Sequence, residues 1–149
     1  VAPARIVFAT PQPRAGHLAR LPLADIALDT YPYNSGTNGS DALRCGVPPV
    51  TFPGDTFAGR MAASLLTAVG MPECIARDRK DYVALAMALG NDAVRRGEIR
   101  ERLQVQRSVS ALFQPQVFAD DLERLYHAMH AQVRRGERGT LVLEASAAP

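Results

Sequence analysis

The sequence has no tryptophan, few aromatic residues, only two cysteines and no long hydrophobic run. Aromatic residues make up 6% of its 149 residues, which leaves no stacking platform for single-stranded nucleic acid. Its 17 basic residues are interleaved with 15 acidic ones, so the net charge of +2 gives no reason to expect a nucleic-acid partner. No stretch reaches the ~20 apolar residues of a membrane-spanning helix. We therefore expect neither a nucleic-acid partner nor a membrane partner.

Metal and disulfide chemistry are also poorly supported. Cys45 and Cys74 are far apart and lack metal-ligand spacing, so free, largely buried thiols in a reducing compartment such as the cytoplasm fit better. His127 and His130 are three residues apart, but no further ligands accompany them, which favours a solvated helix face over zinc. We expect no bound metal and no cofactor.

Short apolar runs alternate with helical patterns along the chain. The apolar runs, expected to be strands, are residues 5–10, 24–30, 48–52 and 74–76. A short helical turn is expected at 17–20 and helices at 40–45, 57–69, 79–89, 93–107 and 115–135, with Gly70 ending the second of these and Asp78 capping the third. Alternation of this kind predicts an α/β fold, a Rossmann-like doubly wound parallel sheet with a helical C-terminal end. We expect one lobe over residues 1–135, closed by helices within 93–135, and a tail over 136–149.

The beginning of the chain predicts a fragment of a longer protein. It has no initiating methionine, lacks the features of a signal peptide, and enters an apolar run almost at once. The predicted sheet is also short for a complete domain of this type.

The polar loop after the second apolar run, residues 34–41 (NSGTNGSD), predicts an anion site. Ligands of parallel sheets bind beyond the carboxyl ends of the strands. Two glycines permit a tight turn, and a helix expected to open at Gly39 to Ser40 presents unpaired N–H groups and a positive dipole end. Asp41, in the expected first turn, could face a ribose hydroxyl. An ordinary capped loop stays open as the alternative, since neither standard nucleotide fingerprint, GxGxxG or GxxxxGK[ST], is present.

The run LADIALDTYPYNSGTNGSDALRCGVPPVTFPGDTFAGRMAASLL resembles the C-terminal catalytic lobe of the O-GlcNAc transferases. The resemblance continues through VQRSVSALFQPQVFADDLERLY and covers about residues 5–135. It implies the C-terminal half of an inverting, metal-independent GT-B glycosyltransferase that moves GlcNAc from UDP-GlcNAc to Ser or Thr of proteins. The departure from the family's HTT, which is Gly36-Thr37-Asn38 here, looks more like a bacterial relative than the animal enzyme.

The resemblance implies roles for four residues of the loop. Thr37 and Asn38 fall where the family uses two adjacent threonines on the diphosphate, Gly39 falls at a turn glycine, and Asp41 at the aspartate that binds the ribose. The sequence departs from the family at Gly36, where a histidine is expected, and at Asn38, whose amide can still donate to a phosphate.

The upstream segment PQPRAGHLAR resembles the nucleoside-binding segment of the same family. By position, the resemblance implies that Gln12 contacts the uracil edge through its backbone. It also implies that Arg14 is a cation beside the nucleoside. The resemblance further implies that the His17 ring packs on the uracil and that Arg20 lies near the base.

The resemblance places the catalytic base and the phosphate-binding lysine upstream, so we expect no catalytic residue in this chain and assign Asp55 none. It implies as partners an N-terminal catalytic lobe, a tetratricopeptide (TPR) array and a protein or peptide acceptor. Two alternatives stay open: a non-catalytic nucleotide-binding or scaffold module, and a related protein O-fucosyltransferase using GDP-fucose. Five arginines are expected to form a solvated helix face: Arg95, Arg96, Arg100, Arg102 and Arg107.

Overall fold

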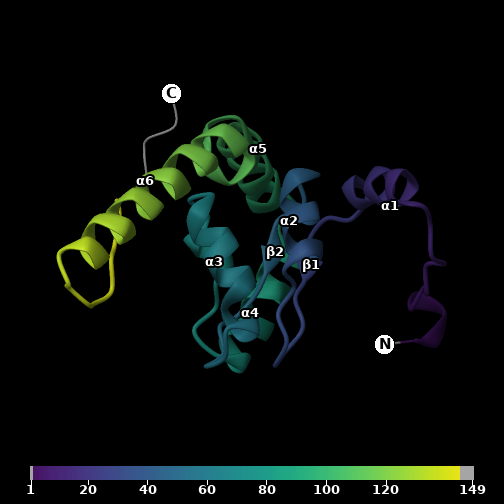
Figure 1. Ribbon diagram of the computed structural model, residues 1–149. Coiled ribbons are helices and arrows are strands. Elements are labelled where there is room, and N and C mark those ends of the chain that lie inside the picture. Colours follow the sequence, from purple (N-terminus) through teal and green to yellow (C-terminus); the bar gives the residue numbers. More distant parts are fainter. Residues whose placement is uncertain (1, 145–149) are drawn as a thin grey trace.

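The structure, a computed structural model, describes residues 2–144 and is rich in helix (Figure 1). Its helices are α1 (Arg14–Arg20), α2 (Thr37–Arg44), α3 (Met61–Ala68), α4 (Arg79–Asn91), α5 (Ala93–Val109) and α6 (Pro115–Arg134). Its strands are β1 (Ala27–Leu28) and β2 (Pro49–Val50). Short 3-10 turns lie at Pro3–Arg5, Leu21–Leu23, Ala58–Arg60, Pro72–Cys74 and Ala111–Phe113.

The sheet is small and parallel. Ala27 pairs with Pro49 and Leu28 with Val50, and a single parallel bridge from Thr51 to Ile75 adds a third segment. The runs predicted as strands at 24–30 and 48–52 thus contain β1 and β2, whereas 74–76 contributes only that bridge. The observed class is therefore α/β with a small parallel sheet, narrower than the doubly wound sheet that the sequence predicts.

The prediction of a buried strand over residues 5–10 is wrong for this structure. The segment follows the Pro3–Arg5 turn as extended chain, and Ile6, Val7 and Phe8 are 57%, 85% and 91% exposed. A strand is stabilised by hydrogen bonds to a neighbour, and within residues 2–144 no strand pairs with this segment. In Figure 1 it stands apart from the sheet, beyond α1.

The core lies where α2 and α4 pack on β2, and where α3 and α5 pack on α2. Its fully buried members include Leu43 of α2, Val50 of β2, Leu66 of α3 and Leu103 of α5. Helical spacing brings one apolar face of each helix to this centre, and α6 extends away from it with no fully buried residue (Figure 1). This packing fixes α2 against the sheet.

Local signals in the sequence set two of the predicted helix ends. Gly70, with a φ of +66°, ends α3 as predicted, and the Asp78 carboxylate accepts a hydrogen bond from the Asp81 N–H at 2.8 Å, capping α4. α1 and α2 begin three residues earlier than expected, at Arg14 and Thr37. The earlier start of α2 brings Thr37 into a helical turn.

The prediction that the arginines of α5 form a solvated face is wrong for two of them. The Arg100 guanidinium donates to the carbonyls of Ala24 (3.2 Å) and Pro22 (3.1 Å). Arg96 donates to the carbonyl of Leu89 at 2.8 Å, and its side chain is only 18% exposed. Long side chains whose donors reach backbone carbonyls fasten α5 to the segment between α1 and β1 and to the end of α4.

Within residues 2–144, no helix has both the length and the apolar character needed to cross a membrane. Cys45 and Cys74 are both free, as expected, and Cys74 is fully buried. His127 and His130 are exposed on α6. The part of the predicted tail over residues 145–149 lies outside the described residues.

Candidate functional site

The N-terminus of α2 opens directly beyond the carboxyl end of β1. Its N-cap residue is Gly36, and no side chain there accepts a hydrogen bond from the first turn. The N–H groups of the first turn, including those of Thr37 and Asn38, therefore keep their donor capacity, and the helix dipole adds positive potential. A helix end of this kind is suited to an anionic ligand.

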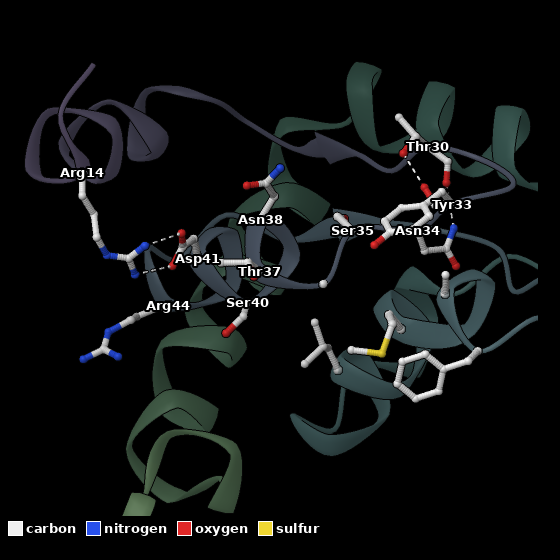
Figure 2. Close-up of a pocket in the computed structure, with 15 residues that line it drawn as sticks. Arg14, Thr30, Tyr33, Asn34, Ser35, Thr37, Asn38, Ser40, Asp41 and Arg44 are labelled. Atoms are coloured by element: carbon white, nitrogen blue, oxygen red, sulfur yellow. Dashed lines mark hydrogen bonds and ion pairs between the residues drawn. The ribbon is translucent and has the colours of Figure 1, made fainter. Parts of the chain in front are cut away.

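A cavity of about 740 Å³ lies at this helix end (Figure 2). Figure 2 shows Arg14, Asp41 and Arg44 at one end of it and Tyr33 and Asn34 at the other. The wall contributed by α3 and the turn before it is largely apolar. The lining residues are Arg14, Thr30, Tyr33, Asn34, Ser35, Gly36, Thr37, Asn38, Ser40, Asp41, Arg44, Phe57, Ala58, Met61 and Leu65. A polar wall facing an apolar wall is typical of small-molecule sites.

Arg14 and Asp41 form a bidentate ion pair at one end of the cavity. The two guanidinium nitrogens donate to the two carboxylate oxygens at 3.0 and 3.3 Å. The Asp41 side chain is 8% exposed and that of Arg14 is 67% exposed, so the carboxylate is fixed while the cation faces solvent. With Arg44 also on the lining, the cavity carries two cations and one carboxylate, a balance that favours an anion.

His17 lies on the other side of α2. It lines a second cavity of about 280 Å³ bounded by α1, β1 and α2, to which Asn38 and Gly39 also contribute. An Arg20 guanidinium nitrogen lies 3.1 Å from His17 Nδ1, and the other donates to the Thr10 carbonyl at 2.8 Å. Because a guanidinium can only donate, Nδ1 is the acceptor and the ring proton of neutral His17 is on Nε2.

Six of the eight predicted nucleotide residues line two neighbouring cavities. Arg14, Thr37 and Asp41 line the larger cavity, His17 and Gly39 the smaller one, and Asn38 lines both. Two lie outside these cavities: Arg20 supports His17, and Gln12 donates to the Thr10 hydroxyl at 3.5 Å.

Two local expectations for the loop are corrected. Gly39 lies within α2 and is buried, so it is not a turn glycine. A Cβ placed there would come within 3.3 Å of Ser35 Oγ and 3.4 Å of Leu65 Cδ1, so the small residue serves close packing. Asp41 lies beyond the first turn, and no side chain caps α2, so neither Ser40 nor Asp41 is its N-cap.

Several residues that build the site have no individual role predicted from the sequence, although Asn34 begins the predicted anion loop. Asn34 is 1% exposed, and its amide donates to the Thr30 carbonyl at 2.7 Å. Within residues 2–144, its Oδ1 is buried without a hydrogen-bond partner. Tyr33, Phe57 and Met61 make up much of the remaining wall. Only the position of Tyr33 and Asn34, just beyond a strand end, could have pointed to them.

Within residues 2–144, no group of three or more His, Cys, Asp or Glu side chains converges in a way that could hold a metal ion. The candidate site offers backbone N–H groups, hydroxyls, an amide and guanidinium groups, which bind anions directly.

The family model described as "Glycosyl transferase family 41" matches residues 1–122. The chain belongs to glycosyl transferase family 41. It is 38% identical over 134 residues, 90% of this chain, to the UDP-N-acetylglucosamine--peptide N-acetylglucosaminyltransferase of Caenorhabditis elegans. It is 35% identical over 121 residues, 81% of this chain, to a probable enzyme of the same name, SPINDLY, from Eustoma exaltatum subsp. russellianum.

A solved O-GlcNAc transferase has the same fold over most of this chain. The O-GlcNAc transferase of Thermobaculum terrenum, solved as a mutant, superposes with a TM-score of 0.74 and 37% identity over 81% of this chain. The chain spans 12% and 13% of the two relatives and 23% of the solved chain. As a family 41 chain it thus corresponds to a small part of the glycosyltransferases that it resembles.

Proposed function

We propose that this chain is the UDP-sugar-binding lobe of an inverting glycosyltransferase that transfers GlcNAc from UDP-GlcNAc to Ser or Thr of proteins. The observation that carries the proposal is the uncapped N-terminus of α2, which opens into a cavity beside the Arg14–Asp41 pair in a family 41 chain. The names of the relatives, which specify UDP-N-acetylglucosamine and a peptide, support this donor and this acceptor class. They do not favour GDP-fucose or a scaffold role.

In the proposed complex, the diphosphate lies on the first turn of α2, in contact with Thr37 and Asn38. The ribose hydroxyls bind Asp41, whose carboxylate Arg14 already orients. The base lies toward His17, with Arg20 and Gln12 beside it. Asn38 lines both cavities, which supports a nucleotide that crosses the helix end from one to the other.

The proposed chemistry is stabilisation of the leaving UDP without a metal. Charge develops on the diphosphate as the glycosidic bond breaks, and a helix N-terminus with nearby guanidinium groups would stabilise it. The catalytic base and the acceptor site belong, in this proposal, to an N-terminal lobe of the same protein, preceded by a TPR array. The small sheet seen here would be part of a wider doubly wound sheet in the C-terminal half of a GT-B glycosyltransferase, and the two free thiols support a cytoplasmic location.

Transfer of GlcNAc from UDP-GlcNAc to a Ser/Thr peptide by the full-length protein tests the proposal. Thr37→Val should lower kcat/KM by roughly 10- to 100-fold because a hydroxyl donor to the leaving group is lost. The control is Thr67→Val on α3, whose hydroxyl bonds only the Ala63 carbonyl. Activity should persist in EDTA. UDP binding without any transfer by the wild type would instead support a non-catalytic module.

A further inference from the structure

The most heavily hydrogen-bonded carboxylate near the site is Asp29, directly after β1. Its Oδ1 accepts from the Thr30 N–H (2.9 Å), the Ser35 N–H (2.7 Å) and the Ser35 hydroxyl (2.6 Å). Its Oδ2 accepts from the Thr51 hydroxyl at 2.6 Å. One side chain thus joins the end of the sheet to both ends of the loop that leads into α2.

The backbone of Asp29 is held by two further contacts. Its N–H donates to the Val50 carbonyl at 3.0 Å, and its carbonyl accepts from the Tyr82 hydroxyl of α4 at 2.9 Å. Thr51, the partner of Oδ2, is fully buried and bridges to Ile75. Asp29 is therefore anchored in the sheet and can impose a position on the loop.

Ser35 carries this position to α2. It immediately precedes Gly36, the N-cap of α2, and its side chain lies against Gly39 in the first turn, where a Cβ would be 3.3 Å from Ser35 Oγ and 3.7 Å from Ser35 Cβ. Because Asp29 holds both the N–H and the hydroxyl of Ser35, it fixes where the first turn of α2 points its N–H groups.

Asp29 is poorly suited to bind the nucleotide itself. Its oxygens already accept four hydrogen bonds, and a free carboxylate near a diphosphate would repel it. We propose that Asp29 is a positioning residue, which acts through Ser35 to set the first turn of α2 for the diphosphate. This inference rests on the proposed function and adds to it a residue outside the UDP-binding set.

The test uses the full-length protein and its affinity for UDP, measured by calorimetry on samples shown by circular dichroism to be folded. Asp29→Asn removes the charge but keeps an oxygen for Ser35. The expected result is about tenfold weaker UDP binding, since charge-assisted hydrogen bonds that fix the loop are lost. The donor KM should rise while the acceptor-peptide KM stays unchanged. Asp25→Asn is the matched control, because Asp25 also loses a charged contact, to Arg96 at 3.6 Å, but is 71% exposed and lines neither cavity.

The sign of the change separates positioning from simple electrostatics. UDP binding that is equal or tighter in Asp29→Asn would overturn the inference, because loss of a nearby negative charge alone favours an anion. If Asp29→Asn does not fold, Ser35→Ala decides: about threefold weaker UDP binding supports the link through Ser35, and unchanged affinity overturns it. A wild-type protein that does not bind UDP would contradict the proposed function itself.

Discussion

At the scale of single residues, the site depends on small side chains as much as on charged ones. Gly36 leaves the end of α2 uncapped, and a Cβ there would meet only Met61 Cε, at 3.7 Å. Gly39 lets Ser35 lie directly against the first turn. The charged pair, Arg14 and Asp41, then lies beside a helix end that no side chain within residues 2–144 caps.

Gly39 gives a prediction that separates packing from helix propensity. Gly39→Ala should lower the free energy of unfolding by about 1 kcal/mol, because Ser35 is held by Asp29 and cannot move away from the new methyl group. Gly97→Ala on α5, where within residues 2–144 no atom outside the local helix backbone lies within 4 Å of the added Cβ, should raise it by up to about 1 kcal/mol. Urea unfolding measures both. Equal effects of the two substitutions would show that Gly39 has no packing role.

Cys74 gives a prediction about pH. Burial raises the pKa of its thiol from 9.0 to about 11, while the charge of Arg95 acts to lower it. Because the folded pKa exceeds the unfolded one, the contribution of the neutral thiol to the free energy of unfolding is complete below pH 9.0. That contribution is lost as pH rises toward about 11. The advantage of wild type over Cys74→Ala in urea unfolding should shrink over that range by roughly 2–3 kcal/mol. A difference that does not vary with pH would contradict it.

At the scale of elements, the arrangement of α1, α2 and β1 creates the site, and α5 keeps α1 in place. The segment from α1 to β1 passes through Pro22 and Ala24, whose carbonyls accept from Arg100. α1 carries Arg14 and His17, so a contact far from the cavity contributes to how the nucleotide residues are presented.

Arg100→Ala should therefore loosen α1 without unfolding α5. We expect faster amide hydrogen exchange over residues 14–24, with exchange in α5 unchanged, because two donors to that segment are removed. Arg79→Ala, an exposed arginine of α4, is the control. Uniformly faster exchange in both variants, or none in Arg100→Ala, would argue against this contact.

The elements that the sequence predicted well are those specified by local signals. Asp78 marks a helix start through a short-range hydrogen bond, and Gly70 marks a helix end through its positive φ. Both effects depend on the residue type at one position, which is visible in a single sequence. The start of α2 was placed too late, because Gly39 has the composition of a turn and its need for close packing comes from Ser35 and Leu65. The run at residues 5–10 has a strand-like composition, but pairing depends on a partner strand that local sequence does not supply.

The candidate site was predicted in part for the same reason. Thr37, Asn38 and Asp41 follow a strand end, where topology predicts a ligand, and they do line a cavity. Asp29 and Asn34 were not singled out, because their importance lies in hydrogen bonds to loop atoms that only the folded chain brings together. Composition alone does not distinguish such residues from ordinary turn residues.

At the scale of the whole molecule, this chain is a family 41 α/β unit that spans 12–23% of the relatives described above. Its cavity is lined by groups that can bind an anion, namely an uncapped helix N-terminus and two guanidinium groups. We propose that this chain binds the leaving nucleotide, while the groups that act on the acceptor belong to other parts of the protein.

Calorimetric titration of UDP into the full-length protein tests the central claim most directly. We predict that the wild type binds UDP, that Asp41→Asn weakens binding about tenfold or more through loss of a carboxylate acceptor, and that Asp55→Asn, an exposed control, has no effect. Absence of UDP binding by the wild type, or equal affinity in Asp41→Asn, would contradict the account.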